Sequence, residues 1–347
     1  MGFLSPPVIL PYRGYGTLQE AHLNGHVLDD RRMYEAEEND RRRRNFKAMI
    51  SRYMADAIPG IRVRICFEQQ EKIVKTDENG YFEAVFNFRK PRTPGWHHAT
   101  FEVMDKLVDY QEEREYGGEV LLVGDNSEYG LISDIDDTIL VSHATQVHRK
   151  LELILTKNAK TRMPFRGVSA FYRALQSTHN EGTPGNPIFY VSSSEWNLYD
   201  FLEDFCDTQK IPKGVFMLRD LKENLWSLVK TGGGSHHHKT HKIRRILDLY
   251  DSMPFVLIGD SGQRDAEIYA EIIANYPGRI LAAYIRDVSD SKRDTYVAHL
   301  SDRINEKGVD MVVVKDTAEA ARHAARLGLL TKEQLSEVES AVTRSRS

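Results

Sequence analysis

Two aspartates, Asp134 and Asp136, follow the short apolar segment Leu131-Ile132. Because the carboxyl end of a buried strand opens onto a ligand crevice, both carboxylates could face one divalent ion. Asp134 could then attack phosphorus as a nucleophile, and Asp136 could act first as the general acid and then as the general base. Thr138 would hold the shape of the loop. The alternatives are a solvated acidic turn, or a magnesium site without a covalent step.

Three small hydroxyl residues, Ser192-Ser193-Ser194, follow the apolar segment 188–191 and precede a helical pattern from Trp196 to Phe205. Hydroxyls and free backbone N–H groups at the start of a helix are suited to binding phosphate. We expect Ser192 to make the direct contact, with Ser193 beside it. Taken alone, the same residues are better explained as a serine N-cap.

Two lysines, Lys239 and Lys242, lie ahead of the next predicted helix. Either could neutralise charge at the aspartate and phosphate groups. We prefer Lys239, because Ile243 and Ile246 then fall on the buried face behind it. Lys242 is the alternative, and a lysine exposed on the surface would serve neither purpose.

A second acidic group, Asp260 and Asp265, follows the apolar segment 255–258. Asp260 could complete an octahedral site of oxygen ligands with Asp134 and the backbone carbonyl of Asp136, which is the geometry that Mg²⁺ prefers. Asp265 would be a further ligand or would hydrogen-bond to one. Neighbouring Gly259 and Gly262 would allow tight turns beside the metal.

Arg286 follows the apolar segment 281–285 at the same predicted edge of the sheet. Its guanidinium could bind phosphate bidentately. It could equally form an ion pair with Asp287 or Asp290, and the residues leave this open.

A histidine patch, His236–His238 with His241, adjoins the lysines. It could bind a transition metal. It could also form a flexible, partly protonated loop, which we prefer because the carboxylates already predict a magnesium site.

The segments that position these residues predict an α/β fold with a doubly wound parallel sheet over residues 126–347, ending in helices. Short segments that are apolar on both faces alternate with amphipathic helices such as 168–175, as expected of a buried parallel sheet. The strand candidates are 131–132, 188–191, 215–218, 255–258, 281–285 and 311–314. The spacing leaves no room for a large cap domain, and an open site suits a lipid head group or a macromolecule.

Residues 1–125 predict a small β-sandwich instead, because their apolar residues alternate. The expected strands are 60–67, 72–75, 81–88, 99–103 and 119–123, with a turn at Asp77–Gly80. Residues 29–59 predict a helical insertion in which Phe46, Met49, Ile50 and Tyr53 share one face. Its Arg41–Arg44 could touch anionic lipid, but an ordinary surface helix is the preferred interpretation.

The 347 residues are 41% hydrophobic and 28% charged, which is typical of a globular protein, and their net charge of -4 gives no global attraction to nucleic acid. Cys66 and Cys206 lie far apart, so we expect no disulfide framework and a reducing compartment. There is no signal peptide pattern and no apolar run long enough to span a membrane. These features predict a cytoplasmic protein that meets membranes only peripherally.

The order D-x-D-x-T, Ser, Lys, G-D-x-x-x-x-D resembles the haloacid dehalogenase superfamily. More narrowly, S-D-I-D-D-T-I, Y-V-S-S-S-x-W-N-L-Y and F-V-L-I-G-D-S-G-Q resemble the catalytic domain of the actin-patch-protein type of phosphatidate phosphatase, over roughly 129–316. The segment Tyr12–Gly16 looks like what precedes this domain in bacterial members, and the T-D-x-x-G-Y-F turn is similar to transthyretin-like modules.

This resemblance implies a Mg²⁺-dependent phosphatase that forms an aspartyl-phosphate and converts phosphatidate to diacylglycerol. It implies a phosphorylated lipid partner at a membrane surface. The alternatives are a phosphatase for a soluble ester or a phosphoprotein, and a scaffold without catalysis.

Overall fold

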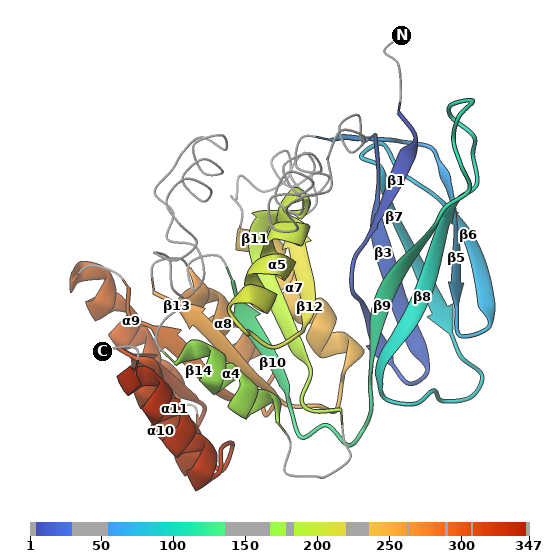
Figure 1. The fold of residues 1–347 in the computed structure, drawn as a ribbon. Helices are drawn as coiled ribbons and strands as arrows, with labels where there is room; N and C mark the ends of the chain where they lie inside the picture. Colours follow the sequence, from blue (N-terminus) through green and yellow to red (C-terminus); the bar gives the residue numbers. More distant parts are fainter. Residues whose placement is uncertain are drawn as a thin grey trace. The chain divides into compact units, whose positions relative to one another are not determined.

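The computed structural model describes residues 5–29, 55–135, 167–177, 184–219, 236–261, 264–288, 291–306 and 308–344. The chain divides into two compact units, and Figure 1 labels many of their helices and strands. The first unit comprises 1–124, 195–203 and 220–226, and the second comprises 125–194, 204–219 and 227–347. None of the described helices is both long and apolar enough to cross a bilayer.

The first unit is a β-structure. Its described strands are β1 (Pro7–Pro11), β2 (Gly14–Thr17), β3 (Glu20–Asp29), β4 (Asp56–Ala57), β5 (Arg62–Phe67), β6 (Gln70–Lys75), β7 (Tyr81–Asn87), β8 (Gly95–Val103) and β9 (Glu115–Val123). They are hydrogen-bonded in the order β1-β3-β2-β9-β8-β5-β6, with β4 and β7 also paired to β3. All five predicted strands are present. The strands β1, β2 and β3 were not predicted.

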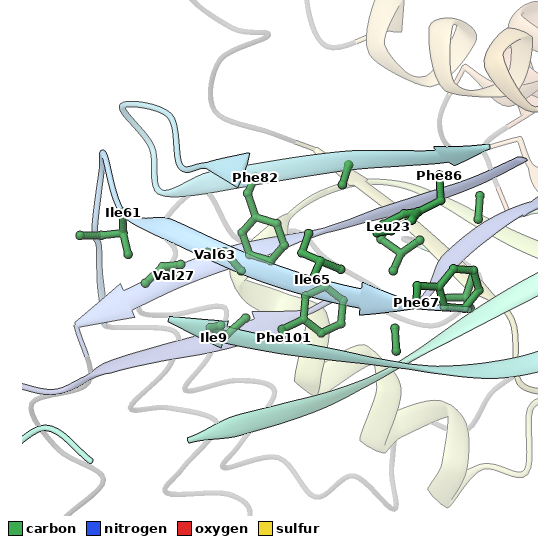
Figure 2. Close-up of a cluster of buried hydrophobic side chains, with 14 of the residues drawn as sticks. Ile9, Leu23, Val27, Ile61, Val63, Ile65, Phe67, Phe82, Phe86 and Phe101 are labelled. Atoms are coloured by element: carbon green, nitrogen blue, oxygen red, sulfur yellow. The ribbon is translucent and has the colours of Figure 1, made fainter. Parts of the chain in front are cut away.

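The core of this unit is built from the alternating apolar residues that predicted its strands. Ile65 on β5 and Phe101 on β8 are almost fully buried, as are Phe82 and Phe86 on β7, and Figure 2 shows them gathered in one cluster. The edge-on neighbours Phe67 and Phe86 have ring centroids 5.8 Å apart. Burying each such ring stabilises the fold by roughly 1.5–3 kcal/mol. The β-character of this unit is therefore explained by packing against one apolar core.

The turn at residues 77–80 joins β6 to β7 as predicted. The Asp77 side chain accepts hydrogen bonds from the backbone N–H of Asn79 at 2.7 Å and of Tyr81 at 3.2 Å. Gly80 has a φ of 70°, in the left-handed region that glycine adopts without strain. The turn chemistry of these four residues thus fixes where β7 begins.

The predicted helical insertion at 29–59 lies largely outside the described residues, including the apolar stripe at 46–53 and its arginines. The prediction of helix is wrong near both ends of this segment, because Asp29 belongs to strand β3 and residues 56–57 form strand β4. Asp29 ends β3 and pairs with Asp56 of β4. The backbone at each end is therefore held in the sheet by hydrogen bonds.

A buried histidine, His26 on β3, makes the first unit sensitive to acid. His26 is 1% exposed, its Nδ1 shares a hydrogen bond of 2.7 Å with the Tyr12 hydroxyl, and its ring stacks on Trp196 with centroids 4.0 Å apart. Burial lowers the pKa of His26 from 6.5 to about 3, although the charge of Asp77 acts in the opposite direction. Between these two pKa values the unfolded chain binds a proton that the folded chain does not.

We therefore expect the first unit to lose stability as the pH falls from about 6.5 towards 3, and to be most stable above this window. The loss contributed by His26 is at most about 1.4 kcal/mol per pH unit. Urea unfolding followed by tryptophan fluorescence at several pH values would measure this slope. His26→Gln should make the slope shallower, and an unchanged slope in this variant would contradict the assignment.

The second unit contains a parallel sheet. Its strands are β10 (Gly130–Asp134), β11 (Ile188–Glu195), β12 (Val215–Arg219), β13 (Phe255–Asp260), β14 (Ile280–Arg286) and β15 (Asp310–Val314), in the order β12-β11-β10-β13-β14-β15. All six strand predictions are confirmed. Every residue of β10 and of β13 is buried, which explains why these segments are apolar on both faces.

Helices separate the parallel strands along the chain. They are α4 (Val168–Gln176), the 3₁₀ turn η2 (Trp196–Leu198), α5 (Tyr199–Thr208), α7 (His236–Leu249), α8 (Asp265–Asn275), α9 (Ser291–Asn305), α10 (Thr317–Arg326) and α11 (Lys332–Arg344). The helices α4, α10 and α11 pack against one another, and α8 packs between α7 and α9. The second unit is thus an α/β fold whose central strands β10 and β13 end side by side.

Candidate active site

Three buried aspartates and one lysine meet at the carboxyl edge of the parallel sheet. Asp134 is the last residue of β10, Asp260 is the last residue of β13, and Asp265 is the first residue of α8. One carboxylate oxygen from each lies within 4.8 Å of the other two. Lys239 places its Nζ 2.9 Å from Asp134 Oδ1 and also donates a hydrogen bond to Asp265 Oδ1. We call these four residues the carboxylate–lysine cluster.

The backbone orients the carboxylates of this cluster. The strands β10 and β13 are parallel neighbours, so their last residues come to one place on the sheet edge. The Ile135 N–H donates to Asp134 Oδ1 at 2.8 Å, and the Asp260 N–H donates to Asp265 Oδ2 at 3.2 Å. Asp134 and Asp265 therefore each have one carboxylate oxygen that accepts a hydrogen bond from the backbone.

The helix α7 delivers Lys239. Ile243 and Ile246 are fully buried on its inner face, as predicted, and Lys239 is 3% exposed. The structure places Lys239 within the first turn of α7, whereas the sequence suggested a position ahead of the helix. Because His236–His238 also belong to α7, they do not form a loop. Lys242 is buried as well, but the described ion pairs with Asp134 and Asp265 are made by Lys239.

Gly259 has a different role from the predicted one. It lies inside β13 and not in a turn. A Cβ atom added to Gly259 would lie 2.5 Å from Asp265 Oδ2 and 2.8 Å from Asp265 Cβ, closer than such atoms approach in proteins. The absence of a side chain at Gly259 therefore lets the Asp265 carboxylate pack directly against the backbone of β13. Gly262 lies outside the described residues.

We expect Gly259→Ala to weaken the binding of a divalent cation by at least tenfold, because the new methyl group displaces the Asp265 carboxylate. Isothermal titration calorimetry with Mg²⁺ as the probe would measure the change. Gly278→Ala is the control for a strained glycine substitution away from the cluster, because its added Cβ would have nothing within 4 Å although its φ of 76° disfavours alanine. Equal Mg²⁺ affinity in the two variants would show that the close approach to Asp265 does not matter for binding.

The cluster has the chemistry of a site for a hard divalent cation. Carboxylate oxygens are the ligands that Mg²⁺ and Ca²⁺ prefer. Burial raises the pKa of Asp265, the nearby charge of Asp260 adds to this rise, and Lys239 opposes it. A cation would stabilise all three carboxylates in their charged form. Asp134, Asp260 and Asp265 are therefore able to hold such an ion, and they are the one group of three or more acidic, histidine or cysteine side chains that could do so among the described residues.

Two of the predicted phosphate contacts are buried or half-buried in β11. Ser192 is 1% exposed and Ser193 is half-buried. Both lie inside the strand, which continues to Glu195 before η2 begins, so the predicted position at a helix start is wrong. In the register of the sheet, Asp134 pairs with Val191, the residue before Ser192. Asp136 and Thr138 lie outside the described residues.

Arg286 is the last residue of β14 and pairs in register with Asp260. Burial lowers the pKa of its guanidinium to about 9, and the charge of Asp260 acts against this shift. Arg286 is thus still a cation at neutral pH. The structure brings this second positive charge to the same edge of the sheet as the cluster.

A tyrosine that sequence reasoning missed supports the first aspartate. The Tyr172 hydroxyl on α4 lies 2.6 Å from Ser133 Oγ, and Ser133 Oγ donates to the Asp134 carbonyl at 2.9 Å. Tyr172 is therefore the donor to Ser133. Its pKa is raised by burial. The sequence identified the helix but carried no signal that distinguishes Tyr172 from its other buried residues.

Comparison with known proteins matches part of the amino-acid sequence to a family. Residues 129–287 match the sequence profile of "Phosphatidate phosphatase APP1, catalytic domain". The phosphatidate phosphatase APP1 of Saccharomyces cerevisiae is 32% identical over 165 residues, which are 48% of this chain and 27% of that protein. An uncharacterized protein of Schizosaccharomyces pombe is 31% identical over 235 residues, which are 64% of this chain and 36% of that protein. The chain thus spans about a third of the length of these relatives.

Similarity to solved structures is weak. A carbohydrate acetylesterase from Xanthomonas citri is 9% identical, and the alignment covers 99% of this chain and 75% of that chain with a TM-score of 0.31. A score this low carries no argument about fold or function.

The sheet and the carboxylate–lysine cluster define the second unit as an α/β domain with a centre suited to a hard cation. Within this unit, residues 129–287 match the family of the phosphatidate phosphatase APP1 catalytic domain. The family resemblance inferred from the motifs is confirmed for this part of the chain.

Proposed function

We propose that this chain is a magnesium-dependent phosphatase that converts phosphatidate to diacylglycerol and phosphate. The observation that carries the proposal is the carboxylate–lysine cluster, which lies inside the part of the chain that matches the family. We further propose a haloacid dehalogenase-like fold for the second unit and a transthyretin-like module for the first. The proposed setting is the cytoplasm, with peripheral contact to a membrane surface that presents the lipid.

Asp134 is the proposed nucleophile. Its carboxylate oxygen forms a bond to phosphorus, and the ester oxygen leaves as the alcohol with a proton from Asp136. Asp136 then accepts a proton from the water that hydrolyses the aspartyl-phosphate and releases phosphate. Covalent catalysis divides one slow hydrolysis into two easier steps. Lys239, 2.9 Å from Asp134, neutralises negative charge as the two anions approach.

Asp134, Asp260 and Asp265 are the side chains proposed to hold Mg²⁺, with the Asp136 carbonyl as a further ligand. When bound, Mg²⁺ supplies positive charge that offsets the charge of the phosphate and the nucleophile. Hydroxyl and guanidinium side chains are proposed to bind the phosphate oxygens: Thr138, Ser192, Ser193 and Arg286.

A phosphate-release assay tests this function. Purified full-length protein would be given phosphatidate in mixed micelles, lysophosphatidate and a set of soluble monoesters, each with and without Mg²⁺. We expect release from phosphatidate that requires Mg²⁺. Faster release from a soluble monoester would show that a soluble ester, and not the lipid, is the substrate. Absence of metal-dependent release from every substrate would favour the scaffold interpretation.

A further inference from the structure

A small cavity lies in the second unit between the parallel sheet and the helices α4 and α10. Its volume is about 40 Å³. Most of its wall is apolar or aromatic and comes from Val168, Phe171, Tyr172, Tyr284, Val314 and Ala320. A volume of this size holds about three groups as large as a water molecule. The cavity could therefore accept a short stretch of carbon chain, but not a ring.

Two residues that line this cavity are connected to neighbours of the carboxylate–lysine cluster in the chain. Gly259 lines the cavity and directly precedes Asp260. Tyr172 lines it as well, and its hydroxyl lies 2.6 Å from the side chain of Ser133, which directly precedes Asp134. The cavity wall thus includes residues at the same carboxyl end of the sheet as Asp134 and Asp260.

The charged side chains of the cavity wall fit an anionic group at one end only. Arg286 lines the cavity from the carboxyl end of β14, next to Asp260 in the register of the sheet. Asp316 also lines it, but this carboxylate accepts the Glu319 N–H at 3.0 Å as the N-cap of α10. A ligand with a phosphate group followed by carbon atoms would match this arrangement of a cation beside an apolar space.

We propose that this cavity holds the first carbon atoms of the alcohol whose phosphate lies at the carboxylate–lysine cluster, with Arg286 binding a phosphate oxygen between the two. In phosphatidate the first of these atoms is the glyceryl CH2 group that carries the phosphate, and the acyl esters on the other two glyceryl carbons would extend outside the cavity. The cavity would then select substrates with a slim, flexible alcohol and disfavour aryl phosphates. This inference rests on the proposed function, because it assigns the position of the phosphate to the cluster.

Binding of phosphonates to the full-length protein with Mg²⁺ tests the cavity without requiring turnover. The probes are inorganic phosphate and methyl-, ethyl-, propyl-, butyl-, hexyl- and phenylphosphonate, measured by isothermal titration calorimetry. Each added carbon should lower Kd about fourfold, as for a buried methylene, until about three carbons fill the space. Longer chains should gain nothing further, and phenylphosphonate should bind no more tightly than methylphosphonate.

Variants distinguish the contribution of the cavity to phosphonate binding from the contribution of the Arg286 charge. Ala320→Leu fills the cavity from α10, so all alkylphosphonates should bind with the Kd of methylphosphonate; Val314→Leu is a second filling variant should the first not fold. Ala325→Leu lies on the same helix outside the cavity wall and should keep the dependence on chain length. Arg286→Gln should weaken every phosphonate by a similar factor and keep that dependence.

A series in which methyl- to hexylphosphonate bind equally to the unchanged protein would overturn the proposal, as would a filling variant with undiminished dependence on chain length. Failure of inorganic phosphate and every phosphonate to bind is a different result. It would reject the phosphate site of the proposed function itself, and the cavity assignment with it.

Discussion

Asp134→Asn should lower the release of phosphate from phosphatidate by roughly 10⁴-fold or more, since an amide cannot replace the attacking carboxylate. The same change should leave the fold intact. An asparagine oxygen can still accept the hydrogen bond that Ile135 N–H gives to Asp134. Phosphate release measured over long incubations, with circular dichroism of both proteins, would establish the two results.

The stability of this variant is a sharper test of the cluster. Three carboxylates with oxygens within 4.8 Å of one another repel, and one lysine offsets only part of that charge. Without Mg²⁺, Asp134→Asn should therefore raise the melting temperature by about 2–4 °C. With Mg²⁺ the difference should shrink or reverse. A variant that melts at a lower temperature than the unchanged protein in EDTA would contradict this account of the repulsion.

Lys239→Met is the second change with a large expected effect. Removing the ammonium group leaves Asp134 and Asp265 buried without the cation that contacts both. We expect the free energy of unfolding to fall by about 3–5 kcal/mol and phosphate release to be lost. Added Mg²⁺ should recover part of the stability, because it supplies positive charge to the same carboxylates.

Lys242→Met is the control for this variant. It removes a buried lysine from the same helix, three residues further on. Denaturant unfolding and phosphate release of the two variants should differ clearly, with the smaller loss for Lys242. Equal losses, or a larger loss for Lys242→Met, would contradict the assignment of Lys239 as the functional lysine.

The strands of the second unit could be predicted because a strand that is buried on both faces is a continuous run of apolar residues. β10 and β13 are short apolar runs, and parallel strands must end at one edge. Asp134 and Asp260 could therefore be placed together before any coordinates. Helical periodicity favours Lys239 over Lys242, and the Lys239 Nζ lies 2.9 Å from Asp134 Oδ1; its role in catalysis stays a prediction.

The strands β1–β3 could not be predicted, because their residues also suit turns. Pro7, Pro11, Gly14, Gly16 and Gly25 interrupt any alternation of apolar residues in this region. The glycines are needed for close approach of neighbouring backbone; a Cβ on Gly25 would lie 2.5 Å from the Leu10 carbonyl oxygen. Contacts of this kind depend on which strands pair, and a single sequence does not encode that pairing in a local pattern. Tyr172 was missed for the same reason, since its partner is 39 positions away.

Residues 195–203 belong to the first unit although they follow a strand of the second. Their side chains are bound into that unit: Trp196 stacks on His26, and the Tyr199 hydroxyl accepts the backbone N–H of Arg13 at 2.9 Å. On the ribosome the first 124 residues therefore emerge well before the piece that completes their packing. The last segment of the first unit ends at residue 226, so synthesis of the two units is interleaved. A fragment ending at residue 124 would leave His26 without its stacking partner.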